Sequence, residues 1–545
     1  MAPAQPAASP RVGVVADDLI WASRLAAAVE RAGGGAVTVS RQDGLAAAGV
    51  EAVLVDLGAR RVDPLAILRA AADAGLPTLA VMQHDDAARR KQARAAGATR
   101  VTSYNAFHQA GPRLVARLLA RPAADPRRDA NHRGGANPGR GANLLRRTTG
   151  SGASDPGTAP QPAGIPPVRY GERLEAARTA LHDRGAAALL LGPGAELRWL
   201  AGYAPLPLER LTLLVVPADG PATLLVPRLE ALGGGGSPAV QGGLVALATW
   251  EETDDPYARA AQLLPVSASR LGARFLVSQP LWALHLLRLQ AALPGARWEL
   301  AATVLRGLRI VKDAQEIELL RAAAHAADEV VLAIVRGRLI GRTEADVGRE
   351  VRERLVAAGH DEASFWIVGS GPYSAEPHHE AGERLIVAGE PVVLDIGGVR
   401  AGYCSDTTRT VWPTGGDPGR GPDDTFRRLY GALEEAQAAA VAAVRPGVAA
   451  EAIDAVARRA IGAAGFREAF THRTGHGIGL EAHEDPYLVA GNRERLAVGH
   501  AFSVEPGIYL EGRYGARIED IVACGADGPD VLNRTERDLF VVNGA

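Results

Sequence analysis

Two pairs of carboxylates at strand-like positions are the residues of this 545-residue chain that point most directly to chemistry. Asp395 and Asp406 lie in residues 392–411, in two runs of β-branched and apolar residues with glycines between them. We interpret the runs as antiparallel strands joined by a tight turn. If the turn centres on Arg400 and Ala401, the carboxylates lie directly opposite each other, and their repulsion costs about 3 kcal/mol at an effective dielectric of about 20. A positive group is therefore expected between them.

A second pair of carboxylates repeats this arrangement. Glu505 and Glu519 occupy two further strand-like runs and mirror each other about Gly512. His476 lies between the two pairs in a stretch of alternating glycines, which disfavours a helix and lets the backbone bring an imidazole into a crowded site. Four carboxylates and one histidine are hard oxygen ligands plus one nitrogen. Such a set suits Mn, Co, Zn or Fe and differs from a soft thiolate site. Because four carboxylates are more than one ion needs, we expect two metals that share a water.

These residues resemble the metallopeptidase superfamily of prolidase, aminopeptidase P and methionine aminopeptidase, which has a pita-bread catalytic fold. The resemblance covers about residues 167–545 and rests on the motifs L-D-I-G-G-x5-C-S-D-T-T-R-T, G-H-G-I-G-L-E-x-H-E-x-P, S-V-E-P-G-I-Y and R-I-E-D. It implies a dinuclear metal centre, with Mn expected and Co or Zn as alternatives. The implied metal ligands are Asp395, Asp406, His476, Glu505 and Glu519.

The resemblance also implies roles beyond metal binding. In the family, a glutamate at the position of Glu505 doubles as the general base, and histidines at the positions of His378 and His483 hydrogen-bond the substrate and the intermediate. His472 is a candidate for lining the substrate pocket. Arg517 is expected to support the carboxylate cluster and the substrate site by hydrogen bonding.

The implied activity is a metal-dependent exopeptidase, an Xaa-Pro aminopeptidase or dipeptidase, that hydrolyses Xaa-Pro bonds with a bridging hydroxide. Two alternatives are a metal-free hydrolase of the creatinase kind and a non-catalytic pita-bread binding module. The first predicts the loss of metal ligands, and none is lost. A non-catalytic binding module would have no reason to hold mutually repelling carboxylates together. We therefore expect the Xaa-Pro exopeptidase, acting on proline-containing peptides.

The chain is predicted to be a multi-domain α/β and α+β protein. Residues 1–120 alternate apolar runs with helical segments, which predicts a doubly wound parallel sheet. Asp17, Asp18 and Asp56 at strand ends resemble a response-regulator receiver (flavodoxin-like) domain. The family's lysine after the fifth strand is missing, so we expect a degenerate interaction module rather than a receiver that is phosphorylated at Asp56.

Three further regions follow. Residues 121–167 are rich in Pro, Gly, Asn and Arg, a composition that predicts a disordered linker. Residues 168–310 resemble the creatinase and prolidase N-terminal domain, which implies a homodimer formed through this domain. Residues 311–545 are expected to form the pita-bread α+β catalytic domain, with four helices covering one sheet that carries both hairpins.

Composition sets limits on partners and location. A net charge of −2 favours neither nucleic acid nor a membrane surface as a partner. Two cysteines are no disulfide framework and fit a reducing compartment. No secretory signal is visible at the N-terminus, and no apolar run reaches the roughly 20 residues of a membrane span. A cytoplasmic protein is expected.

Overall fold

The computed structural model of the protein divides into two compact units, residues 1–151 and 152–545. No helix among the described residues is long and apolar enough to cross a membrane. The described residues are 10–16, 19–39, 49–59, 62–82, 87–103, 107, 111, 114–116, 118–119, 164–265 and 272–545.

A five-stranded parallel sheet forms the centre of the first unit. Its strand order is β2-β1-β3-β4-β5, and described helices follow β1, β3 and β4. This order confirms the predicted doubly wound parallel sheet. The elements are β1 (Arg11–Val15), α1 (Leu19–Arg31), β2 (Gly35–Thr38), β3 (Ala52–Asp56), α3 (Pro64–Asp73), β4 (Thr78–Met82), α4 (Ala87–Ala95) and β5 (Arg100–Ser103).

Asp56 ends β3, as the pattern predicts, and its side chain is buried. The backbone N–H of Gly58 donates a hydrogen bond to Asp56 Oδ1 at 2.8 Å. Asp17 and Asp18 lie outside the described residues, and so do residues 121–163 of the expected linker. The likeness of this unit to a receiver domain stays a prediction.

The second unit begins with a mixed six-stranded sheet in the order β11-β10-β6-β7-β8-β9. Helix α6 packs against it through Tyr170, Leu174, Ala177 and Leu181, which form one buried stripe at helical spacing. The strands are β6 (Ala188–Leu191), β7 (Leu213–Pro217), β8 (Ala222–Pro227), β9 (Val245–Trp250), β10 (Arg274–Val277) and β11 (Arg297–Leu300). The helices are α6 (Pro167–Arg184), α7 (Ala195–Ala201), α8 (Ala231–Gly235), α9 (Pro238–Gln241), α10 (Pro256–Gln262), α11 (Ala283–Ala292) and α12 (Ala302–Arg309).

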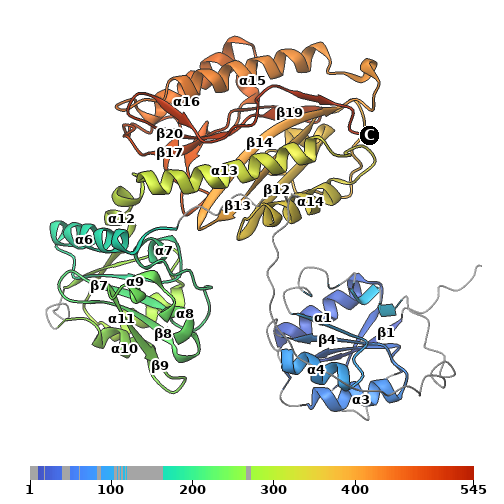
Figure 1. Ribbon diagram of the computed structural model, residues 1–545, viewed down its shortest axis with the longest axis vertical. Coiled ribbons are helices and arrows are strands. Elements are labelled where there is room, and N and C mark those ends of the chain that lie inside the picture. Colours follow the sequence, from blue (N-terminus) through green and yellow to red (C-terminus); the bar gives the residue numbers. More distant parts are fainter. Residues whose placement is uncertain are drawn as a thin grey trace, which may run out of the picture. The chain divides into compact units, whose positions relative to one another are not determined.

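Four long helices, a four-stranded sheet, a five-stranded sheet and a two-stranded sheet follow in the second unit (Figure 1). The four predicted helices are confirmed as α13 (Ala314–Val335), α14 (Glu344–Ala357), α15 (Asp424–Ala442) and α16 (Ala450–Ala463). The prediction of a single sheet is wrong, because the two hairpins lie in separate sheets. The first is β12 (Glu362–Ser370), β13 (Val392–Arg400), β14 (Tyr403–Pro413) and β22 (Phe540–Val542). The second is β16 (Glu484–Leu488), β15 (Gly475–Gly477), β17 (Ala501–Val504), β20 (Asp520–Cys524) and β21 (Pro529–Val531), and β18 (Gly507–Leu510) pairs separately with β19 (Tyr514–Arg517).

Each sheet buries one face under a pair of helices. Leu394 and Ile396 of β13 share a hydrophobic core with α13 and α14, so strand alternation turns Asp395 between them to the opposite face. Phe502 and Val504 of β17 share a core with α15 and α16, which lie side by side in Figure 1. The helices thus leave the remaining faces of both sheets to carry polar side chains.

We expect a chain shortened to begin at Gly164 to fold, because the hydrophobic cores of the second unit draw on residues from Ile165 onward. In scanning calorimetry it should keep the transition of the second unit and lose that of the first. A control beginning at Ala186 lacks α6 and its buried stripe, so it should fail to fold. Loss of the second unit's transition in the chain that begins at Gly164 would contradict this division.

Candidate metal centre

Five side chains from different strands and turns converge in the second unit. Asp395 lies on β13, Asp406 on β14 and His476 on β15, while Glu505 directly follows β17 and Glu519 directly precedes β20. Oxygen atoms of Asp395, Asp406 and Glu519 lie within 4.8 Å of one another. Ligand-type atoms of His476, Glu505 and Glu519 satisfy the same limit. The structure therefore brings together all five residues that the motifs predict as metal ligands.

The first hairpin departs from the predicted register by two residues. Asp395 lies opposite Thr408, and Asp406 lies opposite Gly397, so the two carboxylates are diagonal neighbours on one face. The offset places Thr408 opposite Asp395. The Thr408 hydroxyl donates a hydrogen bond to Glu519 Oε2 at 2.7 Å. Thr408 and Glu519 also form a backbone bridge that joins the two sheets.

The turns explain why one register was predicted wrongly and the other correctly. Ala401 and Gly402, with φ of 48° and 90°, form the first turn one position later than expected. A two-residue hairpin turn of this kind needs positive φ at both central positions, and only the second is a glycine here. The strand pairs on both sides of Glu505 and Glu519 keep the register centred on Gly512, as predicted.

Arg517 supplies the positive charge that the carboxylate cluster requires. Its Nη2 donates to Asp395 Oδ2, and its Nε donates to Thr408 Oγ1 at 3.1 Å. Burial, followed by repulsion from Asp395, raises the pKa of Asp406 well above its usual value. Burial, followed by repulsion from Asp406, does the same to the pKa of Glu519. One arginine is therefore too little charge for this cluster.

Two carboxylate oxygens in the cluster have no partner. Asp395 Oδ1 and Glu519 Oε1 are buried and accept no hydrogen bond from any described residue. Leaving a buried acceptor unpaired costs about 1–3 kcal/mol, and more when the group is charged. Carboxylate oxygens and an imidazole nitrogen are ligands that Mn, Zn, Co and Fe accept. The donor set and the unpartnered oxygens both fit a pair of divalent ions held by these five side chains.

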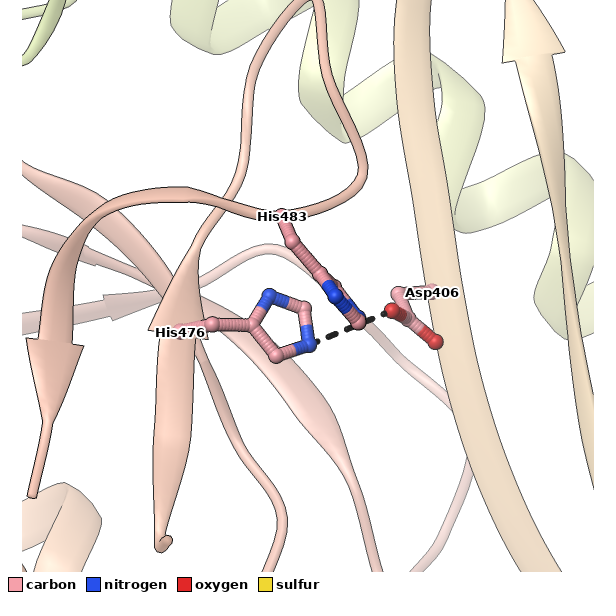
Figure 2. A group of neighbouring side chains, drawn as sticks. All are labelled: Asp406, His476 and His483. Carbon is pink, nitrogen blue, oxygen red and sulfur yellow. Dashed lines mark ion pairs between the residues drawn. The ribbon is translucent and has the colours of Figure 1, made fainter. Parts of the chain in front are cut away.

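His476 is held in the tautomer that a metal ligand needs. Its Nδ1–H donates to the Gly477 carbonyl at 3.1 Å, which leaves Nε2 facing the carboxylates. Nε2 lies 3.2 Å from Glu505 Oε1 and 3.6 Å from Asp406 Oδ2. Figure 2 shows this nitrogen pointing at Asp406. Burial alone would raise the pKa of Glu505, but the hydrogen bond and charge of His476 lower it to about 2.

His483 lies next to the cluster but differs from His476 in exposure. Its ring centroid is 4.0 Å from that of His476, and Figure 2 shows the two rings side by side near Asp406. Asp406, His476 and His483 also meet the spacing for a metal site, although His483 is exposed. Partial burial, followed by the neighbouring charges of His476 and Arg473, lowers the pKa of His483 to about 4. At neutral pH its ring can therefore both donate and accept one hydrogen bond.

Tyr509 joins two of the predicted site residues, His472 and Arg517, by a chain of hydrogen bonds. His472 Nδ1–H donates to the Arg473 carbonyl at 2.7 Å, so Nε2 accepts from the Tyr509 hydroxyl at 2.9 Å. Arg517 Nη1 in turn donates to the Tyr509 oxygen at 2.8 Å. Sequence reasoning missed Tyr509. The hairpin centred on Gly512 contained the signal, because its register makes Tyr509 and Arg517 diagonal neighbours on one face.

A cavity of about 1040 Å³ opens over the cluster. The exposed side chain of His378 lines it, and so do His472, His483 and Arg517. The five ligand-type side chains line the same cavity. All nine residues predicted for the site therefore border one space, which is large enough for a short peptide.

Comparison with protein families matches residues 318–526 to metallopeptidase family M24 and residues 173–311 to the creatinase/prolidase N-terminal domain. The probable dipeptidase PepE of Mycobacterium tuberculosis is 45% identical over 377 residues, which are 68% of this chain and 96% of that protein. The Xaa-Pro dipeptidase of Pyrococcus furiosus is 37% identical over 238 residues, which are 44% of this chain and 67% of that protein.

Solved structures show the same relationship. Dipeptidase PepE from Mycobacterium ulcerans superposes with a TM-score of 0.64 at 44% identity, covering 70% of this chain and all of that one (100%). A prolidase from Thermococcus sibiricus superposes with a TM-score of 0.63 at 33% identity, covering 68% of this chain and 99% of that one. The similarity thus extends over nearly the whole length of both PepE proteins and of this prolidase, and the chain belongs to family M24 of the metallopeptidases.

Proposed function

We propose that the protein is a metal-dependent exopeptidase that cleaves Xaa-Pro bonds in short proline-containing peptides. The observation that carries the proposal is the cluster of five ligand-type side chains, with unpartnered buried oxygens, at one wall of a peptide-sized cavity. Relatives named as dipeptidases and Xaa-Pro dipeptidases support the substrate class. A metal-free hydrolase or a binding-only module would have no use for such a donor set.

Asp395, Asp406, His476, Glu505 and Glu519 would hold two divalent ions, for which we propose manganese, with cobalt or zinc as alternatives. When bound, the ions polarise the peptide carbonyl and make a water nucleophile available near neutral pH. Glu505 is ionised at that pH, so it can accept the proton that the attacking water releases and pass it to the leaving nitrogen.

The histidines that line the cavity complete the proposed chemistry. His483 is neutral at pH 7 and can donate a hydrogen bond to the carbonyl oxygen as negative charge develops on it. His378 lines the same cavity and is proposed to bind the substrate. His472 is proposed to shape the pocket, since Tyr509 and Arg517 hold its ring in one orientation. Arg517 also keeps Asp395 in place.

We also propose that the protein is a cytoplasmic homodimer that associates through residues 168–310. Leu206, Leu229 and Leu232 in this region are 75%, 74% and 93% exposed, so apolar side chains are available for such a contact. Both cysteines are buried free thiols, which fits a reducing compartment.

Removal of the metal should abolish turnover, because the carboxylate cluster has no other way to supply a nucleophile. Treatment with a chelator followed by dialysis is expected to remove activity, and readdition of Mn or Co is expected to restore it. Elemental analysis beside each assay gives the metal content. Full activity in protein without bound ions would contradict the proposed chemistry.

An Xaa-Pro dipeptide should be cleaved by the manganese-loaded protein, and a parallel Xaa-Pro-Xaa tripeptide tests whether longer peptides are also accepted. The same peptides with alanine in place of proline are the control, and we expect them to be cleaved more slowly. Equal rates for proline and alanine peptides would overturn the proposed specificity but not the peptidase activity.

Substitution of the two neighbouring histidines should separate catalysis from metal binding. His483→Ala is expected to lower turnover by roughly 10² to 10⁴ with little change in metal content, as for a positioned acid–base or oxyanion group. His476→Ala should lower metal content as well as turnover, and Glu505→Gln should affect both. His182→Ala, at an exposed surface histidine, is the control. Metal loss in His483→Ala but not in His476→Ala would show that the two roles are reversed.

A further inference from the structure

A short basic segment forms ion pairs with the loop that carries His483. The segment contains Arg306 and Arg309 of α12 together with Lys312, and it joins the N-terminal six-stranded part of the second unit to helix α13. We refer to these three residues as the basic clamp. Its partners in that loop are the acidic residues on either side of His483, namely Glu481, Glu484 and Asp485, while Arg306 also pairs with Glu494 and Arg309 with Glu196.

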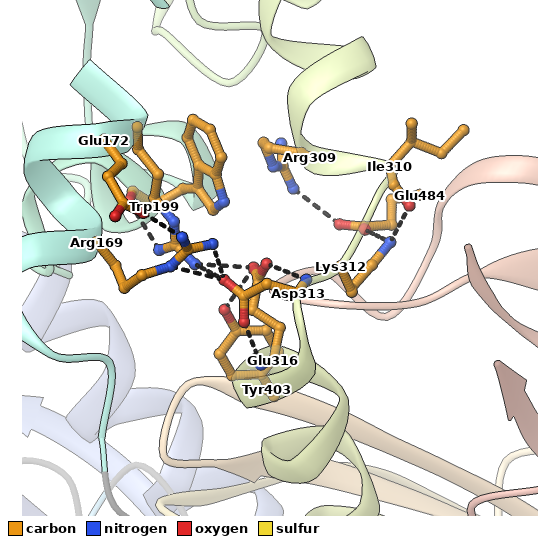
Figure 3. A network of polar contacts seen from close by, with 11 residues as sticks. Arg169, Glu172, Trp199, Arg309, Ile310, Lys312, Asp313, Glu316, Tyr403 and Glu484 are labelled. Carbon is orange, nitrogen blue, oxygen red and sulfur yellow. Dashed lines mark hydrogen bonds and ion pairs between the residues drawn. The ribbon is translucent and has the colours of Figure 1, made fainter. Parts of the chain in front are cut away.

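Glu484 is the residue most firmly held by the clamp. Lys312 Nζ donates to Glu484 Oε1 at 2.6 Å, and Arg309 Nη2 donates to Glu484 Oε2 at 2.8 Å. Arg309 Nη2 also donates to Glu481 Oε2 at 2.7 Å. Figure 3 shows Arg309 and Lys312 reaching Glu484 from the same segment. Both carboxylate oxygens of Glu484 are therefore held by cations.

Burial makes this contact stronger than an ordinary surface ion pair. The side chains of Lys312, Glu484 and Arg309 are 2%, 11% and 12% exposed. Exposed ion pairs contribute little and are screened by salt, whereas pairs shielded from solvent are screened much less. Lys312 is also one of only two lysines in an arginine-rich chain. Its compact ammonium lies in an enclosed position beside Glu484.

His483 depends on its loop for its position. No described residue makes a hydrogen bond to its side chain, which is exposed. Its ring lines both the metal-site cavity and a second cavity of about 510 Å³ beside Arg306 and Arg309. Open space on that side gives the ring room to turn away from the metal site. The backbone of Glu484 pairs with Gly477, next to the ligand-type His476, so Glu484 ties the loop to the site.

We propose that Arg309 and Lys312 are positioning residues that hold His483 over the metal site through Glu484. The inference rests on the proposed function in one respect, since it takes His483 to act on the substrate. The clamp comes from the segment that leads out of the N-terminal part of the second unit. That part therefore contributes to catalysis by fixing a loop of the catalytic part, in addition to any role in covering the cavity.

Lys312→Met and Glu484→Gln in the full-length protein test the proposal. Each should lower kcat by on the order of 10- to 100-fold with metal content unchanged, because a displacement of about 1 Å is enough for such a loss. Each should also raise the hydrogen-exchange rate of residues 479–486. Arg321→Met is the matched control, because it breaks a 2.8 Å ion pair with Asp530 away from both cavities. It should change neither kcat nor exchange in the loop.

The His483→Ala background gives the sharper test. If Lys312 acts through His483, Lys312→Met should cause no further loss of kcat in that background, so the two losses should not multiply. A further tenfold loss would overturn the proposal. If Lys312→Met alone does not fold, the double variant Lys312→Met/Glu484→Gln is used in its place, because it leaves no unpaired charge at residue 484.

Failure of the proposed function can be told apart from failure of the clamp. If the intact, manganese-loaded protein cleaves no Xaa-Pro peptide, the proposed function is wrong whatever the clamp variants do. Hydrogen exchange needs no substrate and still decides the structural claim. Unchanged exchange of residues 479–486 in both Lys312→Met and Glu484→Gln would overturn the clamp.

Discussion

Mutual repulsion among four carboxylates in one small, largely buried volume is the constraint on which the rest of the second unit depends. Such a cluster cannot stay ionised unless cations compensate it. The described part of the cluster includes one permanent cation, Arg517, which Asp395, Thr408 and Tyr509 hold in place. The uncompensated negative charge and the unpartnered oxygens define a site for metal ions. Metal binding relieves the repulsion among the carboxylates, so the free energy spent in assembling them strengthens metal binding.

The fold meets this constraint by using one face of each sheet for the hydrophobic core and the other face for the charged site. One face of each sheet is packed with helices and apolar side chains, and the other face is left free for charged residues. Strand alternation then decides which residues of a motif enter the core and which enter the site. The isolated bridge between Thr408 and Glu519 joins the two sheets where the carboxylates meet. A single flat sheet would not bring both hairpins to one point.

Local sequence patterns predicted the helices, the strands and the set of metal ligands. They could not predict contacts between segments that are distant in the sequence. The register of the second hairpin followed from Gly512, which adopts positive φ at its turn. The first register was missed because Ala401, a residue without glycine's freedom, occupies such a position. Tyr509 and Thr408 act through partners in other strands. Lys312 and Glu484 are 172 residues apart, and no local signal says that they meet.

The burial of Lys312 also affects how the protein can be handled in the laboratory. Amine-directed reagents attack exposed lysines, and Lys312 is shielded by its own ion pair. Lys91, the only other lysine, lies exposed on α4 of the first unit. Apart from the terminal amine, dyes, cross-linkers and activated surfaces will therefore attach at one side chain outside the unit that holds the metal centre. Lys91 thus provides one reactive side chain for immobilisation or fluorescence work without any engineered cysteine.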